Sequence, residues 1–155
     1  METISSFDEL AAFFAESGLV HESVPDQSMI KLPTQKDTLD GVIFVRWEPA
    51  QQVVHFVQSL NIALTKERLE PFALAIALLN HVLPFPGFGI NVPQGYSYYR
   101  FSMPLRPDGT LTRQEIQGLF NLCVRMASEH RPALAAVAEN NADPLSVLPA
   151  GQPQA

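Results

Sequence analysis

The side chains that could perform chemistry are four histidines, one cysteine and a few serines near glycine, and their spacing limits what they can do. His21, His55, His81 and His130 are scattered along the 155 residues. A zinc site on a helix needs two ligands one turn apart, and none of these histidines has a second ligand at that spacing. The sequence therefore predicts neither a metal site nor a bound cofactor.

Two glycine-containing segments match catalytic loops only in part. Gly95-Tyr96-Ser97-Tyr98-Tyr99 begins like a nucleophile elbow, but that turn needs glycine where Tyr99 stands. Gly87-Phe88-Gly89 has the first two glycines of a dinucleotide-binding loop, but Val92 occupies the third position and no helix follows. Cys123 lies on the apolar side of a helical pattern without a base beside it, which indicates a small buried hydrophobic residue. We therefore expect that the protein is not an enzyme.

Composition and charge indicate a soluble cytoplasmic protein. The single cysteine cannot form an internal disulfide. The first residues lack the features of a signal peptide, and the longest apolar run, 72–79, is far shorter than the ~20 residues that span a membrane. Ten basic residues stand against sixteen acidic ones, a net charge of −6. Because no basic cluster is present, we expect neither nucleic acid nor a membrane as the partner.

Capping signals and apolar spacing predict a helix near each end of the chain. Ser6–Glu9 and Thr112–Glu115 match the capping box, in which serine or threonine caps the helix and a glutamate reaches back to the cap. Apolar residues follow at helical spacing, which predicts helices over about 6–17 and from 112 to about 140. Pro132 is expected to bend the second of these helices.

A third helix is expected near 66–82, with Pro71 in its first turn. The segment 72–79 is apolar nearly all round the helix. A helix with this pattern is usually buried on every side, so we expect it to be the central and most buried helix of the protein.

Alternating apolar residues between turn signals predict about five strands. Consecutive hairpins without crossover helices favour an antiparallel sheet with helices packed on it, an α+β fold. We expect residues 1–142 to form this single domain and residues 143–155, rich in Pro, Ala and Gln, to form a flexible tail. The expected strands cover residues 28–32, 42–47, 53–57, 88–92 and 96–105.

The last of these strands carries an aromatic side that could bind a partner. Alternation places Tyr96, Tyr98 and Arg100 on one side and the core residues Tyr99, Phe101, Met103 and Leu105 on the other. Tyrosine and arginine are enriched at protein interfaces, which makes the first three residues candidates for partner binding. A solvated strand face has the same composition, so this alternative stays open. The bare side formed by Gly87, Gly89 and Asn91 would let another backbone or helix approach closely.

The hairpin 42–57 predicts self-association. Phe44, Trp47 and Phe56 cannot all lie on the same face of one hairpin if alternation holds. Large apolar surface is then left over, which a second copy would bury in a two-fold contact. We therefore expect a homodimer with these three residues in its interface.

Four segments together resemble the YbjN family of bacterial proteins over roughly residues 5–140. They are Ala75-Ile76-Ala77-Leu78-Leu79-Asn80, Phe88-Gly89-Ile90, Tyr99-Arg100-Phe101-Ser102-Met103-Pro104-Leu105 and Pro132-Ala133-Leu134-Ala135-Ala136-Val137. The resemblance implies a fold like that of type III secretion chaperones, which are compact α+β dimers that hold client chains on a curved sheet. It transfers no catalytic residues.

These observations lead to one main hypothesis and one alternative. The main hypothesis is a chaperone-like or regulatory adaptor that binds a segment of another protein. The alternative is a regulatory domain that senses a small molecule, either at the face of Tyr96, Tyr98 and Arg100 or in a pocket under the helix near 66–82. A deep cavity with convergent polar groups would favour the alternative.

Overall fold

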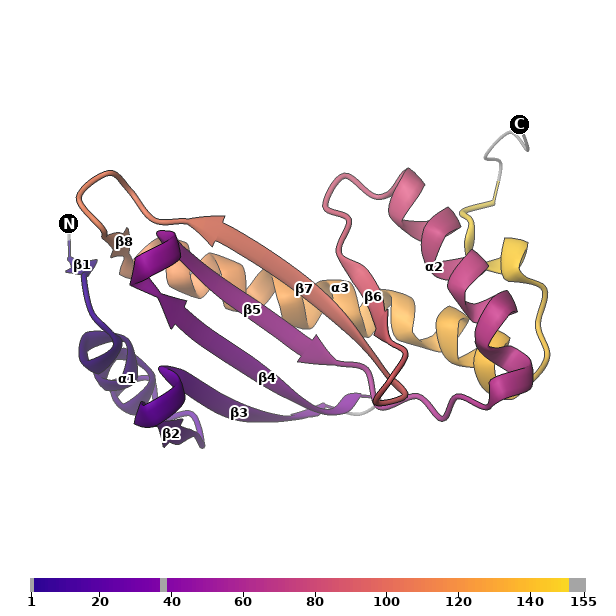
Figure 1. The fold of residues 1–155 in the computed structure, drawn as a ribbon, viewed down its shortest axis with the longest axis horizontal. Helices are drawn as coiled ribbons and strands as arrows, with labels where there is room; N and C mark the ends of the chain where they lie inside the picture. Colours follow the sequence, from indigo (N-terminus) through magenta and orange to yellow (C-terminus); the bar gives the residue numbers. More distant parts are fainter. Residues whose placement is uncertain (1, 37–38, 151–155) are drawn as a thin grey trace.

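The computed structural model describes residues 2–36 and 39–150, which form two antiparallel sheets and three α-helices (Figure 1). Proline or glycine lies between several of these elements, as expected of residues that interrupt regular structure. In chain order the elements are β1 (Thr3–Ile4), α1 (Phe7–Glu16), β2 (Glu22–Val24), η1 (Pro25–Gln27), β3 (Met29–Lys36), β4 (Leu39–Glu48), η2 (Pro49–Gln51), β5 (Val53–Ser59), η3 (Lys66–Arg68), α2 (Leu69–Val82), β6 (Phe88–Asn91), β7 (Tyr96–Pro104), β8 (Leu111–Thr112), α3 (Arg113–Glu139) and η4 (Pro144–Val147).

The larger sheet has six strands in the order β2-β3-β4-β5-β7-β6, and every neighbouring pair is antiparallel. This confirms the α+β fold with three helices and an antiparallel sheet. β1 and β8 pair separately and join the start of the chain to the start of α3. The sequence did not predict β1, β2 or β8, because strands of two or three residues are too short to show alternation.

The β2–β3 and β4–β5 hairpins of the large sheet use the same kind of turn. In each, proline opens a single 3-10 turn, Pro25–Gln27 or Pro49–Gln51, whose next residue adopts the left-handed conformation. These residues are Ser28 at φ 48° and Gln52 at φ 54°. Proline fixes the φ angle at which such a turn begins, so a Pro-x-Gln sequence between two alternating segments specifies the hairpin.

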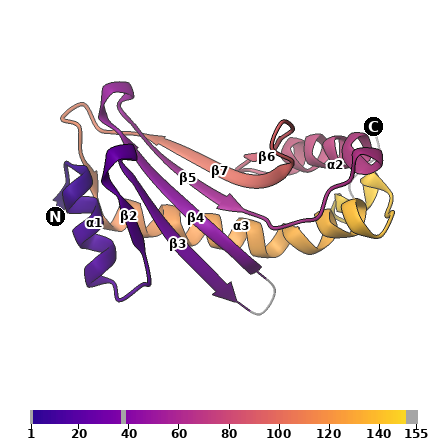
Figure 2. The ribbon, with the colours of Figure 1, turned by 60° about the horizontal axis from the view of Figure 1, so that its bottom comes forward.

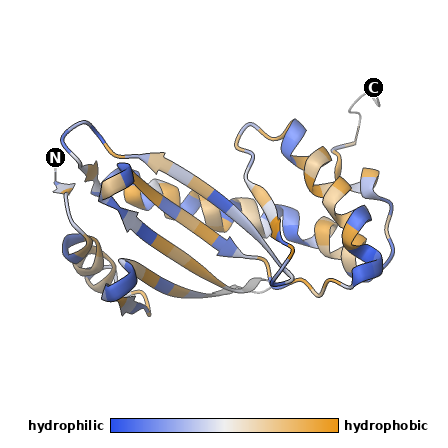
Figure 3. Ribbon diagram, in the orientation of Figure 1, coloured by the Kyte–Doolittle hydropathy of each residue, from blue (hydrophilic) through white to orange (hydrophobic). Residues whose placement is uncertain are grey.

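One face of the large sheet is covered by α3, which runs along the length of the strands (Figures 1 and 2). Apolar and polar residues form bands of colour along the strands (Figure 3), and alternate strand residues such as Val45, Trp47, Val54 and Phe56 are buried. The described residues place no helix over the opposite face, which we call the open face. The core between the sheet and α3 includes Val45, Trp47, Val54, Phe56, Tyr99, Ile116, Leu119 and Cys123.

The expectation that α2 is the central helix is wrong. α2 lies beyond the end of the sheet and packs on the last turns of α3 (Figure 1), and it buries Phe72, Ile76 and Leu79. Its other side is exposed, with Leu74 at 52%. The pattern was misleading because alanine and leucine also occupy the exposed positions, so the helix looks apolar all round although only one side is buried. α3, which continues through Pro132, is the central helix.

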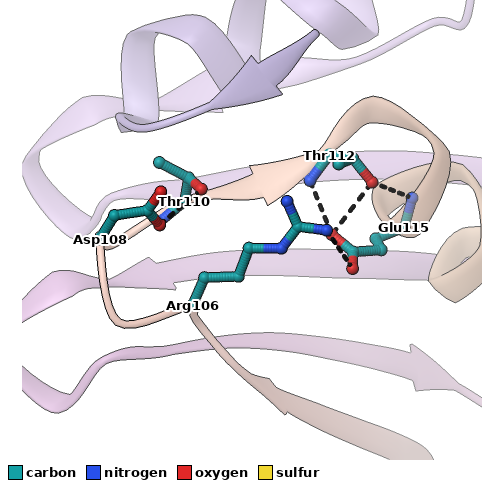
Figure 4. A network of polar contacts seen from close by, with 5 residues as sticks. All are labelled: Arg106, Asp108, Thr110, Thr112 and Glu115. Carbon is teal, nitrogen blue, oxygen red and sulfur yellow. Dashed lines mark hydrogen bonds and ion pairs between the residues drawn. The ribbon is translucent and has the colours of Figure 1, made fainter. Parts of the chain in front are cut away.

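The capping box at the start of α3 is confirmed. The Glu115 amide donates to Thr112 Oγ1 at 3.1 Å, and the Thr112 amide donates to Glu115 Oε2 at 2.7 Å (Figure 4). The amide of Thr112 is the main reason why the pKa of Glu115 is lowered, and Arg106 adds an ion pair at 3.0 Å. At α1 the Glu9 amide donates to Ser6 Oγ as expected, but the Glu9 carboxylate accepts from Ser5 instead of the cap residue.

The predicted flexible tail begins inside the packed body. Pro144–Val147 form η4, which lies against α2 and α3, and the Val147 side chain is only 7% exposed. The Arg68 guanidinium also reaches this region, since it donates to the carbonyl of Val137 at 2.6 and 2.9 Å and to that of Ala142 at 3.2 Å. Residues 151–155 lie outside the described residues.

Truncation after Asn141 is therefore expected to destabilise the protein. It removes Ala142 and Val147, and burial of one valine side chain contributes about 1.5–3 kcal/mol. Urea unfolding followed by circular dichroism would measure the loss. A chain that ends at Ala150 is the control, since it keeps all of η4. Equal stability of both truncated chains would show that η4 contributes nothing to the fold.

Candidate functional site

The open face of the sheet is the candidate site, because large side chains gather there without a covering element among the described residues. Strand register aligns Phe44 with Val57 and Val57 with Arg100 in one row, and Arg46, His55 and Ser102 in the next. Ser59 is aligned with Tyr98. Phe44, Val57 and Tyr98 are half-buried, and Tyr96 is 41% exposed.

Tyr96, Tyr98 and Arg100 lie on the same side of β7, as alternation predicted. The two tyrosine rings are tilted against each other with their centroids 6.0 Å apart. The Arg100 guanidinium carbon lies 5.9 Å from the centroid of the Tyr98 ring, within range of a cation–π interaction. The three residues form one continuous surface. Their role in partner binding stays a prediction.

The turn between β6 and β7 holds Tyr96 in place. The Asn91 side-chain amide donates to Tyr96 Oη and to Gln94 Oε1, both at 3.3 Å, while Asn91 Oδ1 accepts from the Gln94 amide at 3.1 Å. Gly95 takes a left-handed φ of 70°, which closes the turn. Tyr96 is therefore fixed at the rim of the open face.

The bare glycine side of β6 is occupied by the same chain. A Cβ atom on Gly89 would lie 2.6 Å from Tyr98 Cζ and Oη, so the Tyr98 ring lies directly over this glycine. A Cβ atom on Gly87 would collide with the Arg100 carbonyl oxygen. The sequence indicated a close approach here and the approach exists, but it is made by β7 and not by a partner.

Asn80 at the end of α2 anchors the start of β6. Its side-chain oxygen accepts from the amides of Gly87 and Phe88 at 3.1 and 3.0 Å, and its amide donates to the Phe88 carbonyl at 2.9 Å. These bonds satisfy backbone groups on the outer edge of the sheet. Sequence reasoning did not assign this role, since it requires knowing that α2 ends beside β6.

Two hollows open on the two sides of the Tyr96–Tyr98 pair. The first hollow has a volume of about 350 Å³ and is lined by Phe44, Val57, Ser59, Gln94, Tyr96 and Tyr98. The second hollow, of about 590 Å³, shares Val57 and both tyrosines and adds Ile90, Asn91, Val92, Pro93 and Arg100. Apolar walls with a few polar groups are typical of sites that take up side chains or small ligands. Only the second hollow carries a charged side chain.

Two of the three predicted dimer-interface residues lie in the core. Trp47 is 2% and Phe56 0% exposed, and both point to the covered face under α3. Phe44 alone faces the open side. The three residues do divide between the two faces, as alternation requires, but α3 covers the larger share of the apolar surface within one chain. Trp47 and Phe56 therefore cannot contact a second copy.

Sequence reasoning missed a row of polar side chains that crosses the open face. Arg46 pairs with Glu48 at 2.9 Å, His55 Nε2 lies 3.7 Å from Glu48, and His55 Nδ1 lies 2.6 Å from Ser102 Oγ. Serine hydrolases use the opposite arrangement, with Nε2 on the serine and a close acid on Nδ1. We interpret the row as cross-strand pairing, which typically contributes about 0.2–1 kcal/mol per pair. Only the register brings His55 beside Glu48 and Ser102.

The groups that could act as nucleophiles in the core are unreactive at neutral pH. Cys123 is fully buried, as predicted, and burial raises the pKa of its thiol to about 12. Burial also raises the pKa of Tyr99 to about 12, and its hydroxyl donates to the Phe85 carbonyl at 3.1 Å. Both side chains serve packing.

The fold defines a class of α+β proteins with one helix-covered and one open sheet face. A chain of the HopA1–SchA chaperone–effector complex has the same fold, with a TM-score of 0.56 and 16% sequence identity, covering 81% of this chain and 94% of that chain. The model of the YbjN family, described as a proposed bacterial sensory transduction regulator, matches residues 6–136. The chain belongs to the YbjN family, which confirms the resemblance found in the sequence. No curated protein matches it.

None of the helices in the described part of the chain is long and apolar enough to cross a membrane.

Proposed function

We propose that this protein binds a segment of another polypeptide on the open face of its sheet, as a chaperone-like or regulatory adaptor. The observation that carries the proposal is the pair of hollows around Tyr96 and Tyr98. Rigid aromatic side chains with a polar tip bind protein partners well, because they offer large contact area at low cost in side-chain entropy. The family description and the fold shared with a chaperone–effector complex support a protein partner.

The form of the surface favours a polypeptide over a small molecule. The two hollows share walls, and those walls include exposed residues such as Tyr96, Gln94 and Arg100. A small ligand usually has most of its surface buried, whereas a peptide can lie across both hollows at once. The second candidate is a small apolar ligand in the first hollow, because about 350 Å³ lies within the range of such sites.

We also propose that the protein is not an enzyme. It is supported by the unreactive Cys123 and by the geometry of His55 and Ser102, which does not match that of a hydrolase. A cytoplasmic location also belongs to the proposal, since a reduced compartment suits a single free cysteine.

Site-specific photocrosslinking would test the proposed surface. A photoreactive phenylalanine analogue at position 96 is expected to crosslink a specific protein in native lysate, and the crosslink should disappear when Tyr98→Ala is added. The analogue at Asn121, exposed on α3 on the other side of the molecule, is the control and should not crosslink the same protein. If the analogue at position 96 crosslinks no specific protein, and a small molecule raises Tm, the second candidate is favoured.

We also propose that the protein is a homodimer that uses the exposed side of α2. Leu74 is the large apolar residue there, and exposed Ala73 and Ala77 would allow a second helix to approach closely. Two-fold contacts are the commonest interfaces of soluble oligomers. Light scattering after gel filtration should give about 34 kDa, twice the chain mass of 17.1 kDa, and Leu74→Asp should halve it. A wild-type monomer at tens of micromolar would exclude the dimer.

A further inference from the structure

The second hollow contains a cation with which no described residue forms an ion pair, the guanidinium of Arg100. Two other cations on the large sheet are paired, Lys31 with Glu22 at 3.7 Å and Arg46 with Glu48 at 2.9 Å. Arg100 forms no ion pair with any carboxylate of the described residues. Its guanidinium lies over the Tyr98 ring and remains exposed. Arginine presents several N–H donors in a planar fork, and such a group can accept a carboxylate through two hydrogen bonds.

The first hollow lies directly beside this cation and is apolar. Phe44, Val57 and Arg100 occupy one row across three neighbouring strands. Neighbouring strands are about 4.8 Å apart, so the backbones of Phe44 and Arg100 lie roughly 10 Å apart. Ser59 and Gln94 add uncharged polar groups to the first hollow but no charge. A single short peptide segment can therefore reach both hollows.

We propose that the bound segment places a large apolar side chain in the first hollow and the carboxylate of an aspartate or glutamate on Arg100 in the second. This inference rests on the proposed function and specifies the chemistry of the partner. The net charge of −6 would by itself favour a basic segment. Local charge decides recognition at short range, however, because charges beyond about 8 Å are largely screened at physiological salt. A basic residue of the bound segment would be repelled by Arg100 at the second hollow.

A displayed library of random peptides, selected on the full-length protein, tests the inference. Enriched peptides should carry aspartate or glutamate near tryptophan, phenylalanine or leucine, and fluorescence anisotropy would then measure their affinities. Arg100→Glu is expected to weaken binding about tenfold or more, as expected for loss of a charge-assisted hydrogen bond. Replacing the acidic residue of the peptide by its amide should weaken binding to the wild type, but should strengthen binding to Arg100→Glu because it removes the repulsion between two carboxylates.

Arg125→Glu is the matched control. It makes the same change of charge at an exposed position of α3, the helix that covers the other face of the sheet, and should leave affinity unchanged. Peptides that lose affinity in Phe44→Asp and Tyr98→Ala but show no acidic preference would overturn this inference and leave the proposed function standing. If no peptide binds, or if these two variants bind as well as the wild type, both proposals fail.

Discussion

Phe56→Ala is expected to lower the free energy of unfolding by about 3–5 kcal/mol, the usual cost of removing a large aromatic side chain from a core. Phe56 is fully buried between the sheet and α3. Phe44→Ala, on the neighbouring strand, should cost only about 1–2 kcal/mol, because Phe44 points to the open face and is partly exposed. Urea unfolding of both variants under identical conditions would measure the difference.

The comparison of these two variants also reports on what covers the open face. Both residues are phenylalanines in aligned strands, so intrinsic strand preference cancels. A cost at Phe44 as large as that at Phe56 would mean that Phe44 is covered in solution, for instance by a second chain. In that case the cost at Phe44 should fall on dilution, since stability gained from association depends on concentration.

Leu79→Asp is expected to prevent folding. The Leu79 side chain is 1% exposed on the side of α2 that packs on the rest of the chain, and a carboxylate buried there has neither water nor a partner to solvate it. Leu74→Asp makes the same substitution on the exposed side of the same helix and should keep the folded helical spectrum. Far-ultraviolet circular dichroism of the two purified variants is the measurement.

The two substitutions, Leu79→Asp and Leu74→Asp, also test whether α2 packs on the rest of the chain with only one side. If α2 were surrounded by protein on all sides, both substitutions would abolish the fold. If both variants folded, α2 would not be needed to hold the body together. Leu78, which lies between the two sides and is half-buried, should show an intermediate loss on the same change.

Most of the fold could be predicted because local signals and the final structure agree. Proline turns at Pro25 and Pro49, period-two alternation and the Thr112 capping box each specify their element through neighbouring residues alone. What the sequence could not show was which helix crosses the sheet. That choice depends on contacts between distant segments, and an alanine-rich helix such as α2 gives the same pattern whether one side or all sides are buried.

The candidate site was predicted only where it lies within one strand. Alternation along β7 brought Tyr96, Tyr98 and Arg100 together correctly. The contribution of Phe44 to the first hollow and the pairing of His55 with Ser102 depend on strand register, and register is set by hairpins and sheet order that a linear pattern does not reveal. The buried positions of Trp47 and Phe56 depend in the same way on the position of α3.

The position of α2 has a consequence for the timing of folding during synthesis. Its buried side is covered by the end of α3 and by η4, which are the last described elements of the chain. Between Val82 and Val147 the ribosome adds 65 residues, which takes roughly 3–13 seconds at 5–20 residues per second. β6 is made soon after α2 and can pack on it early, but the part of α2 that packs on α3 and η4 lacks its partners throughout that interval. Slow translation of residues 83–147 would therefore lengthen the period in which this protein needs protection from aggregation.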